Sequence, residues 1–174
     1  MVYTPDQKDL FLRLTGSFGR LGFSIVDAKI HTTRHGYALD SFFIHDTTNQ
    51  ASYRDVVQYV EHELVQVLVD ASPARPPSGR LSRQVRHFPI EPQVSVRPDE
   101  TRQHFILSVT AADRPGLLFA IAEVLVEHGI ALQAAKIVTL GERAEDVFLL
   151  DTRGLEHERD ALRLEQALHA VLAH

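Results

Sequence analysis

The sequence predicts an α+β protein made of two ferredoxin-like βαββαβ units lying side by side, each an antiparallel sheet with helices on one face. The first observation behind this prediction is an internal repeat. With an offset of 107 residues, like residues recur at Asp6/Asp113, Leu10/Leu117, Leu14/Ile121, Gly22/Gly129, Ala28-Lys29-Ile30/Ala135-Lys136-Ile137 and Thr32/Thr139. The second observation is that helical and strand periodicities follow in the same order in both halves.

The offset falls by one after the next turn, where Asp40 and Phe42 match Asp146 and Phe148. A slip of one residue between two strand-like runs is what a hairpin loop of different length leaves behind. The repeat is too long for one unit of a solenoid, so it indicates a small domain that has been duplicated.

The composition excludes several classes of protein. The 174 residues contain no cysteine and carry a formal net charge of −5, which leaves no disulfide framework, no thiolate metal site and no general affinity for polyanions. No apolar run approaches the roughly 20 residues that span a bilayer, and the first residues have no signal-peptide pattern. The expected location is therefore the cytoplasm, with no membrane partner.

In the first unit, residues 4–6 open a helix whose apolar stripe consists of Leu10, Phe11, Leu14 and Phe18, and Gly22 ends it. Residues 23–33 then alternate as a strand, with Val26, Ala28 and Ile30 expected on one face. A turn at residues 34–36 precedes a second strand at 37–46. A second helix is expected from about residue 53 to residue 68.

Residues 71–102 are expected to form a linker between a first unit (1–70) and a second (103–174). The linker is rich in Pro and Arg, and the alternation over 85–97 predicts one or two short strands, which Pro89 and Pro92 confine to a sheet edge or a break. These strands are left open to either unit.

The second unit is expected to contain strands at 103–110, 130–140 and 145–151 and helices at 115–128 and about 158–173. The first unit has only Met1-Val2-Tyr3 where the second has its first strand, so the first strand is expected to be truncated. An unpaired strand at a sheet edge is a docking surface, and we therefore expect pairing between the two units or between two chains.

The stretch Asp113-Arg114-Pro115-Gly116-Leu117-Leu118 lies where a predicted strand gives way to a predicted helix. Pro115 suits the first turn of a helix, and Gly116 lets the backbone approach a ligand closely because it has no Cβ. The positive helix end can hold an anion while Asp113 holds a cation. The stretch is thus a candidate site for a zwitterion, and equally a well-capped helix start.

These six residues, followed by a helix that ends in Glu127-His128-Gly129-Ile130, resemble the opening of an ACT domain. That family is a small βαββαβ module that binds amino acids and regulates the enzymes attached to it. Further segments are similar to the tandem ACT regions of enzymes that modify the PII signalling protein, and they are Tyr3 to Phe11, Ala28 to Ile30, Thr32 to Asp40 and Arg86 to Pro92.

The resemblance implies a regulatory region that binds L-glutamine and switches an attached nucleotidyltransferase/hydrolase, with no catalysis in this chain. It implies a ligand site made of Asp113, Arg114, Pro115, Gly116 and Leu117 with Ile130, Ala131 and Leu132 opposite. The matching set in the first unit, expected to be weaker, is Asp6, Gln7, Asp9 and Leu10 with Phe23, Ser24 and Ile25. Asp9 there puts negative charge near a would-be carboxylate site.

The implied partners are L-glutamine, the catalytic domains of the longer chain, and PII through them, with a homodimer as a further expectation. Mg²⁺ is expected only in those catalytic domains, and no cofactor is expected here. One alternative is a protein-interaction or dimerisation module without a small-molecule ligand. Another is a stand-alone ACT-repeat protein that senses a different amino acid.

Other candidate sites carry less weight. His31 and His35 are four apart but in a strand and a turn rather than a helix, so they do not form a metal pair. The linker arginines lack the aromatic pattern with which ferredoxin-like sheets stack RNA bases. No phosphate-binding glycine loop and no Gly-x-Ser-x-Gly motif is present.

Overall fold

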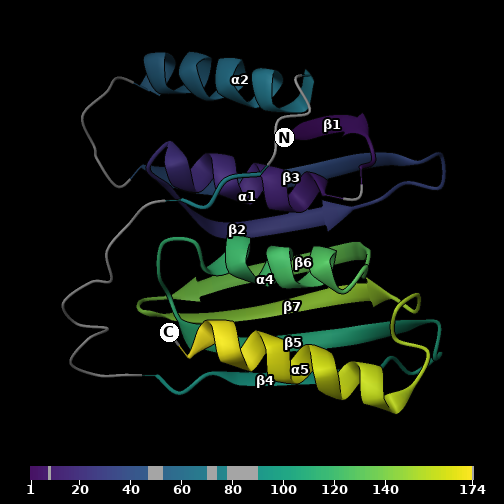
Figure 1. Cartoon of the computed structure of the whole chain (residues 1–174). Coiled ribbons are helices and arrows are strands. Elements are labelled where there is room, and N and C mark those ends of the chain that lie inside the picture. Colours follow the sequence, from purple (N-terminus) through teal and green to yellow (C-terminus); the bar gives the residue numbers. More distant parts are fainter. Residues whose placement is uncertain (8, 47–52, 70–73, 78–89, 174) are drawn as a thin grey trace.

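The computed structural model describes residues 1–7, 9–46, 53–69, 74–77 and 90–173. Their elements run in the order β1 (Val2–Pro5), α1 (Leu10–Arg20), β2 (Phe23–His31), β3 (Tyr37–Asp46), α2 (Tyr53–Val69), β4 (Gln93–Pro98), β5 (His104–Ala112), α4 (Leu117–Glu127), β6 (Leu132–Leu140), β7 (Arg143–Asp151) and α5 (Glu158–Leu172). The described strands form one seven-stranded sheet in the order β1-β3-β2-β6-β7-β5-β4. In Figure 1, α1, α4 and α5 lie in front of this sheet and α2 lies beside α1.

The two units of the repeat are both present, so the predicted fold class is confirmed. The first unit contains β1, α1, β2, β3 and α2, and the second contains β5, α4, β6, β7 and α5 with β4. Repeat-related residues hold the same places: Leu10 and Leu117 each begin a helix, and Leu14 and Ile121 are both fully buried. The repeated sequence therefore encodes a repeated core.

The two units join through antiparallel pairing of β2 with β6. Ala28, Lys29 and Ile30 pair with Ile137, Lys136 and Ala135, so the identical tripeptides of the two repeats face each other. Since Lys29 lies opposite its own counterpart Lys136, a local twofold axis passes between them. The contact has the form of an isologous dimer interface, built within a single chain.

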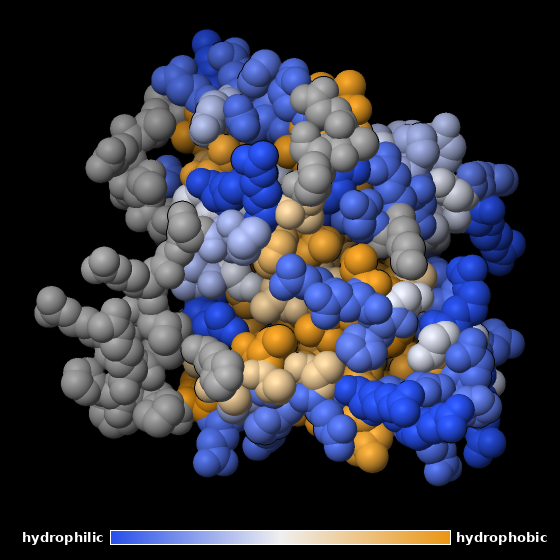
Figure 2. All heavy atoms as spheres, viewed as in Figure 1, coloured by the Kyte–Doolittle hydropathy of each residue, from blue (hydrophilic) through white to orange (hydrophobic). Residues whose placement is uncertain are grey.

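The helices reinforce this join on the covered face of the sheet. Phe11 and Leu12 of α1 belong to the hydrophobic cluster of the second unit rather than to that of the first. The ring of Phe11 meets the ring of Phe148 edge-on at a centroid distance of 6.3 Å. Figure 2 shows apolar atoms gathered over the middle of this face, with hydrophilic atoms over α2 and α5. Separating the units would expose this apolar surface.

The short strand predicted in the linker belongs to the sheet of the second unit. β4 pairs with β5 from Gln93↔Thr110 to Pro98↔Phe105 and forms an edge of the sheet. The rest of the predicted stretch, residues 85–89, lies outside the described residues. In the first unit, β1 has four residues and pairs only with Tyr37–Asp40 of β3, whereas the nine residues of β5 pair along all of β7.

An arginine in each unit fastens the end of its second helix. In the second unit, Arg114 Nη2 donates to the backbone oxygen of Val171 at 2.7 Å. In the first unit, Gln7 occupies the position equivalent to Arg114, and the guanidinium comes instead from Arg13, which donates to Gln7 and to the oxygen of Val67. The same contact is thus made from a different position in the chain.

Two local predictions were wrong. Val26 was expected on the buried face with Ala28, but the register of β2 against β3 shifts between Ile25 and Asp27 and leaves Val26 40% exposed. A β-bulge reverses the alternation at the extra residue, which periodicity alone does not reveal. Pro115 was expected in the first turn of a helix, but α4 begins at Leu117 after Gly116, whose φ is +85°.

The paired lysines provide a test of the inter-unit contact. Lys29 and Lys136 are both exposed and directly opposite, and like charges in that arrangement are destabilising. We expect Lys136→Glu to raise the free energy of unfolding by about 0.2–1 kcal/mol at low salt, measured by urea denaturation.

The double variant Lys29→Glu/Lys136→Glu restores like charges and should lose this gain, and added salt should reduce it in the single variant. Equal stability of the single and double variants would contradict the pairing.

Candidate ligand-binding site

A pocket of about 220 Å³ lies between the two units. The second unit contributes the turn from Asp113 to Phe119 together with Ile137, Thr139, Ala144 and Asp146, and the first unit contributes Thr15, Gly19 and the stretch Gly22 to Ile25. Pockets for drug-sized molecules are about 300–1,000 Å³, so this one suits a smaller ligand.

The strand-to-helix turn of the second unit is fixed by backbone bonds. The Asp113 N–H donates to the oxygen of Glu142 at 2.8 Å, and the Leu117 N–H donates to the oxygen of Arg114 at 3.1 Å. Gly116 is the N-cap of α4 in a left-handed conformation, and no side chain caps the helix. Because the first N–H groups of a helix have no partner within it, donors of the first turn of α4 remain for a ligand.

Opposite helix ends meet at the pocket. It is lined by the first residues of α4 (Leu117, Leu118) and, from α1, by Gly19 near the C-terminal end with Gly22 just beyond. A helix carries partial positive charge at its N-terminus and partial negative charge at its C-terminus. The pocket therefore offers complementary ends for a small molecule that carries both charges.

Two carboxyl groups line the pocket, Asp113 and Asp146. Burial raises the pKa of Asp146 to about 7, and the negative charge of Asp113 also acts to raise it. The hydrogen bond from the Val138 N–H acts in the opposite direction, but its effect is smaller than that of burial. Burial also raises the pKa of Asp113, against a bond from the Arg114 N–H. The pair therefore retains a proton at higher pH than isolated carboxyls do.

Asp146 was missed as a site residue by the sequence analysis, although a signal existed. It alternates with Phe148 and Leu150 on β7, both fully buried, and it is itself 1% exposed. Its repeat partner Asp40 is equally buried, and its pKa is raised to about 6 by burial, against a bond from the His31 N–H. A repeated acidic residue on the inward face of a strand marks a position with an unusual electrostatic role.

The pocket brings together residues from both predicted sets. The turn residues Asp113 to Leu117 lie in it with Phe23, Ser24 and Ile25, which the sequence analysis had placed with the first unit's turn. Ile130, Ala131 and Leu132, expected opposite Asp113, do not line it. Leu132 begins β6 and Thr139, which does line the pocket, lies near its other end. The assignment of all these residues to a ligand site stays a prediction.

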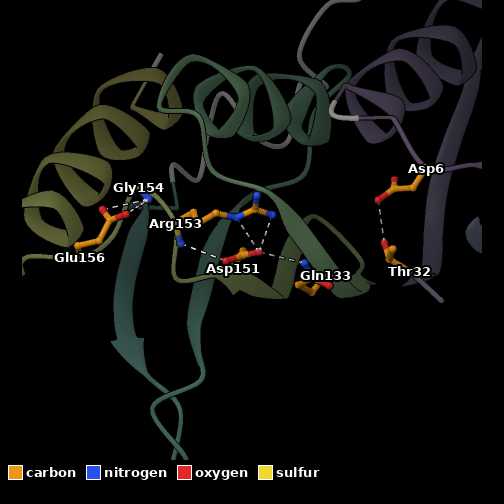
Figure 3. A network of polar contacts seen from close by, with 7 residues as sticks. All are labelled: Asp6, Thr32, Gln133, Asp151, Arg153, Gly154 and Glu156. Carbon is orange, nitrogen blue, oxygen red and sulfur yellow. Dashed lines mark hydrogen bonds and ion pairs between the residues drawn. The ribbon is translucent and has the colours of Figure 1, made fainter. Parts of the chain in front are cut away.

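The corresponding turn of the first unit is held by other contacts. The Thr32 hydroxyl donates to Asp6 at 3.4 Å, and the Asp6 N–H donates to the oxygen of Gly36 at 2.9 Å. Asp9 is the N-cap of α1 without a side-chain cap bond, and Leu10 is buried. Figure 3 shows Asp6 and Thr32 facing each other on one side and Asp151 on the other, where its carboxylate contacts Gln133 and Arg153.

A short described stretch of the linker, residues 74–77, crosses the rim of the pocket. A Cβ added to Gly19 would lie 2.4 Å from Cβ of Pro77, and one added to Gly116 would lie 3.1 Å from Cγ of the same proline. The oxygen of Arg75 accepts a bond from Arg20 of α1 at 3.1 Å. Glycine at these two rim positions therefore leaves room for the linker to touch both units.

Within the described ranges, no group of three or more His, Asp or Glu residues is arranged to hold a metal ion. No helix among those residues is long and apolar enough to cross a membrane.

Comparison with known proteins agrees with the fold. A family model described as "ACT domain" matches residues 105–168, most of the second unit. The first unit repeats the same arrangement of strands and helices beside it. Residues 105–168 therefore match an ACT domain, and the fold of the chain fits two ACT units side by side.

More particular relatives share nearly the whole chain. It is 63% identical over 169 residues to the bifunctional uridylyltransferase/uridylyl-removing enzyme of Aromatoleum aromaticum, covering 97% of this chain and 20% of the relative. Proteins with the same description from Ralstonia nicotianae and Chromobacterium violaceum are 51% and 48% identical over 99% of this chain, which covers 21% and 20% of their lengths. The chain thus spans about a fifth of the length of these relatives.

The buried carboxyls predict how stability depends on pH. Burial in the folded protein raises the pKa of Asp40 to about 6 and the pKa of Asp146 to about 7. Their contribution to the stability of the folded protein is therefore fully present below about pH 4, and it is lost as the pH rises through these two values. We expect the free energy of unfolding to fall across this range, by at most about 1.4 kcal/mol per pH unit for each group.

The two variants Asp40→Asn and Asp146→Asn separate the contributions in chemical denaturation between pH 4 and pH 8. The fall in the free energy of unfolding between pH 6 and pH 7 should become much smaller in Asp146→Asn, where only Asp40 still titrates near pH 6, and it should persist in Asp40→Asn. The same profile in both variants would show that Asp146 does not titrate in this range.

Proposed function

We propose that this chain is an amino-acid-sensing regulatory region that binds L-glutamine in the pocket between its two units. The observation that carries the proposal is that one pocket is shared by the Asp113 turn, the N-terminus of α4 and the start of β2. The match of residues 105–168 to the ACT family supports a ligand of the amino-acid class. The choice of glutamine rests on the family resemblance.

In this proposal the ligand's carboxylate lies at the first turn of α4, where backbone N–H groups and the helix dipole favour an anion. Its ammonium group lies toward Asp113 and the C-terminal end of α1. The side-chain amide extends toward the start of β2, where the half-buried Ser24 supplies a hydroxyl. Each polar end of the ligand then meets groups of the opposite character.

Regulation follows from the position of the pocket between units. A ligand that contacts both α4 and β2 favours the arrangement of units in which both contacts form, and it shifts the equilibrium only by its difference in affinity for the two arrangements. Coupling free energies of this kind are about 1–3 kcal/mol. The names of the relatives suggest that the controlled activities are uridylyl transfer and removal, in catalytic domains outside this chain. That these domains act on PII rests on the family resemblance.

A second candidate function, a protein-interaction module, has an observation of its own. The face of the sheet opposite the helices carries Phe43, Val147 and Leu39 with 59%, 43% and 39% of their surface exposed. Leu39 and Val147 alternate along their strands with buried residues, and Phe43 lies between the half-buried Phe42 and Ile44. This apolar face is suited to contact with another protein surface, in this chain's dimer or in the longer chain.

The test is a calorimetric and thermal-shift titration of this chain with glutamine, with glutamate, asparagine and serine as controls. We expect selective stabilisation by glutamine, of about 2.7 kcal/mol at about a hundredfold excess over the dissociation constant. Asp113→Ala should weaken binding by about 10-fold to 100-fold, the usual worth of a hydrogen bond to a charged group. Gly116→Val should also weaken it, because valine is strained at a φ of +85°.

Asp6→Ala, at the equivalent position of the first unit, is the matched variant and should have the smaller effect. Oligomerisation that depends on protein concentration, with no stabilisation by any of the four amino acids, would contradict the sensor and favour the interaction module.

A further inference from the structure

One oxygen of Asp146 is unsatisfied. Its Oδ1 accepts the Val138 N–H at 3.2 Å, whereas its Oδ2 is buried and has no hydrogen-bond partner among the described residues. The residue is 1% exposed and lines the pocket. A buried polar atom without a partner destabilises the folded state, and more so when it is charged, so Oδ2 is an acceptor that a donor group of a ligand in the pocket would satisfy.

Among the residues that the structure describes, no cation serves as that partner. The ionisable residues that line the pocket are Asp113, Arg114 and Asp146, and Arg114 donates to the oxygen of Val171. The other charged residues described on adjoining elements are exposed, bonded elsewhere or on the opposite side of the sheet, and they include Arg13, Arg20, Asp27, Lys29, Glu123, Lys136, Arg143 and Glu145. Glu142 bonds the Asp113 N–H through its backbone oxygen. The charge of Asp113 acts on Asp146 and raises its pKa.

We propose that Asp146 and Asp113 together form the counter-ion for a primary ammonium group of the ligand, and that the bound ligand displaces the proton that this pair holds. This inference rests on the proposed function, because it assigns a residue and a proton to the same pocket. Asp146 acts in it as a determinant of specificity for ligands that carry an ammonium group.

The physical basis is that two neighbouring buried carboxyls do not both ionise readily. In the empty pocket the pair holds one proton near neutral pH, since burial raises both pKa values. An ammonium group brings three N–H donors and a positive charge, which satisfies Oδ2 and balances the second negative charge. The displaced proton passes to water, the ligand keeps its own protons, and no covalent bond is made or broken.

Affinity should therefore depend on pH in a defined direction. Below about pH 7 the ligand competes with a proton for the pair, so binding weakens about tenfold for each further pH unit. Well above pH 7 the pair is ionised, and the affinity approaches a constant value. A ligand of the same shape without the ammonium group, such as 4-carbamoylbutanoate for glutamine, gains nothing from the second ionised carboxylate.

The experiment is isothermal calorimetry of this chain with glutamine between pH 6 and pH 8, in two buffers of different ionisation enthalpy. Binding should be about tenfold weaker at pH 6 than at pH 8, with release of nearly one proton per ligand at pH 6 and almost none at pH 8. Asp146→Asn should bind more weakly at pH 8 with a flat pH profile. Asp40→Asn, the equivalent buried carboxyl of the first unit, is the control and should keep the wild-type profile.

The outcomes separate the two proposals. Glutamine binding without proton release at pH 6, or a wild-type pH profile in Asp146→Asn, would overturn the counter-ion pair and leave the sensor intact. Equal affinity of the unmodified chain for glutamine and 4-carbamoylbutanoate would do the same, and this comparison remains decisive if Asp146→Asn does not fold. Absence of binding at every pH would reject the proposed function, and the counter-ion pair with it.

Discussion

The backbone hydrogen bonds between β2 and β6 join two small sheets into one, and the position of every other element depends on them. They set Lys29 opposite Lys136, which places α1 antiparallel beside α4 and brings Phe11 against Phe148. The same alignment sets the C-terminal end of α1 next to the N-terminal end of α4. The pocket exists because of that alignment, since neither unit alone supplies both its turn and its facing strand.

Much of the fold could be predicted because the repeat and the periodicities are properties of local sequence. Leu14 and Ile121 recur at equivalent positions and are both fully buried, so one core pattern predicted both units. The structure differs from the prediction where the local sequence pattern does not determine the backbone conformation. The bulge at Val26 depends on the pairing of β2 with β3. The start of α4 depends on the left-handed conformation of Gly116, which the presence of Pro115 in the sequence does not predict.

The site was predictable in part for a related reason. The turn at Asp113 has a sequence signature, but the strand that faces it across the pocket is β2 of the other unit, and a sequence does not say which unit supplies that wall. Asp146 was visible only as an acidic residue alternating with Phe148. Its Oδ2, which has no hydrogen-bond partner among the described residues, and its proximity to Asp113 are features of the tertiary structure. The contact of Pro77 with two glycines on the rim is likewise a product of packing.

A site shared by two ACT units in one polypeptide has a consequence for the range of conditions in which it works. When such a site lies between separate subunits, dilution below the dissociation constant of the dimer removes the site itself. Here covalent linkage of the two units, with β2 paired to β6, makes their association intramolecular, with an effective concentration that does not change when the protein is diluted. Under the proposed function, the occupancy of the pocket then depends on the concentration of the ligand and not on that of the protein, even in a cell that holds few copies of the protein.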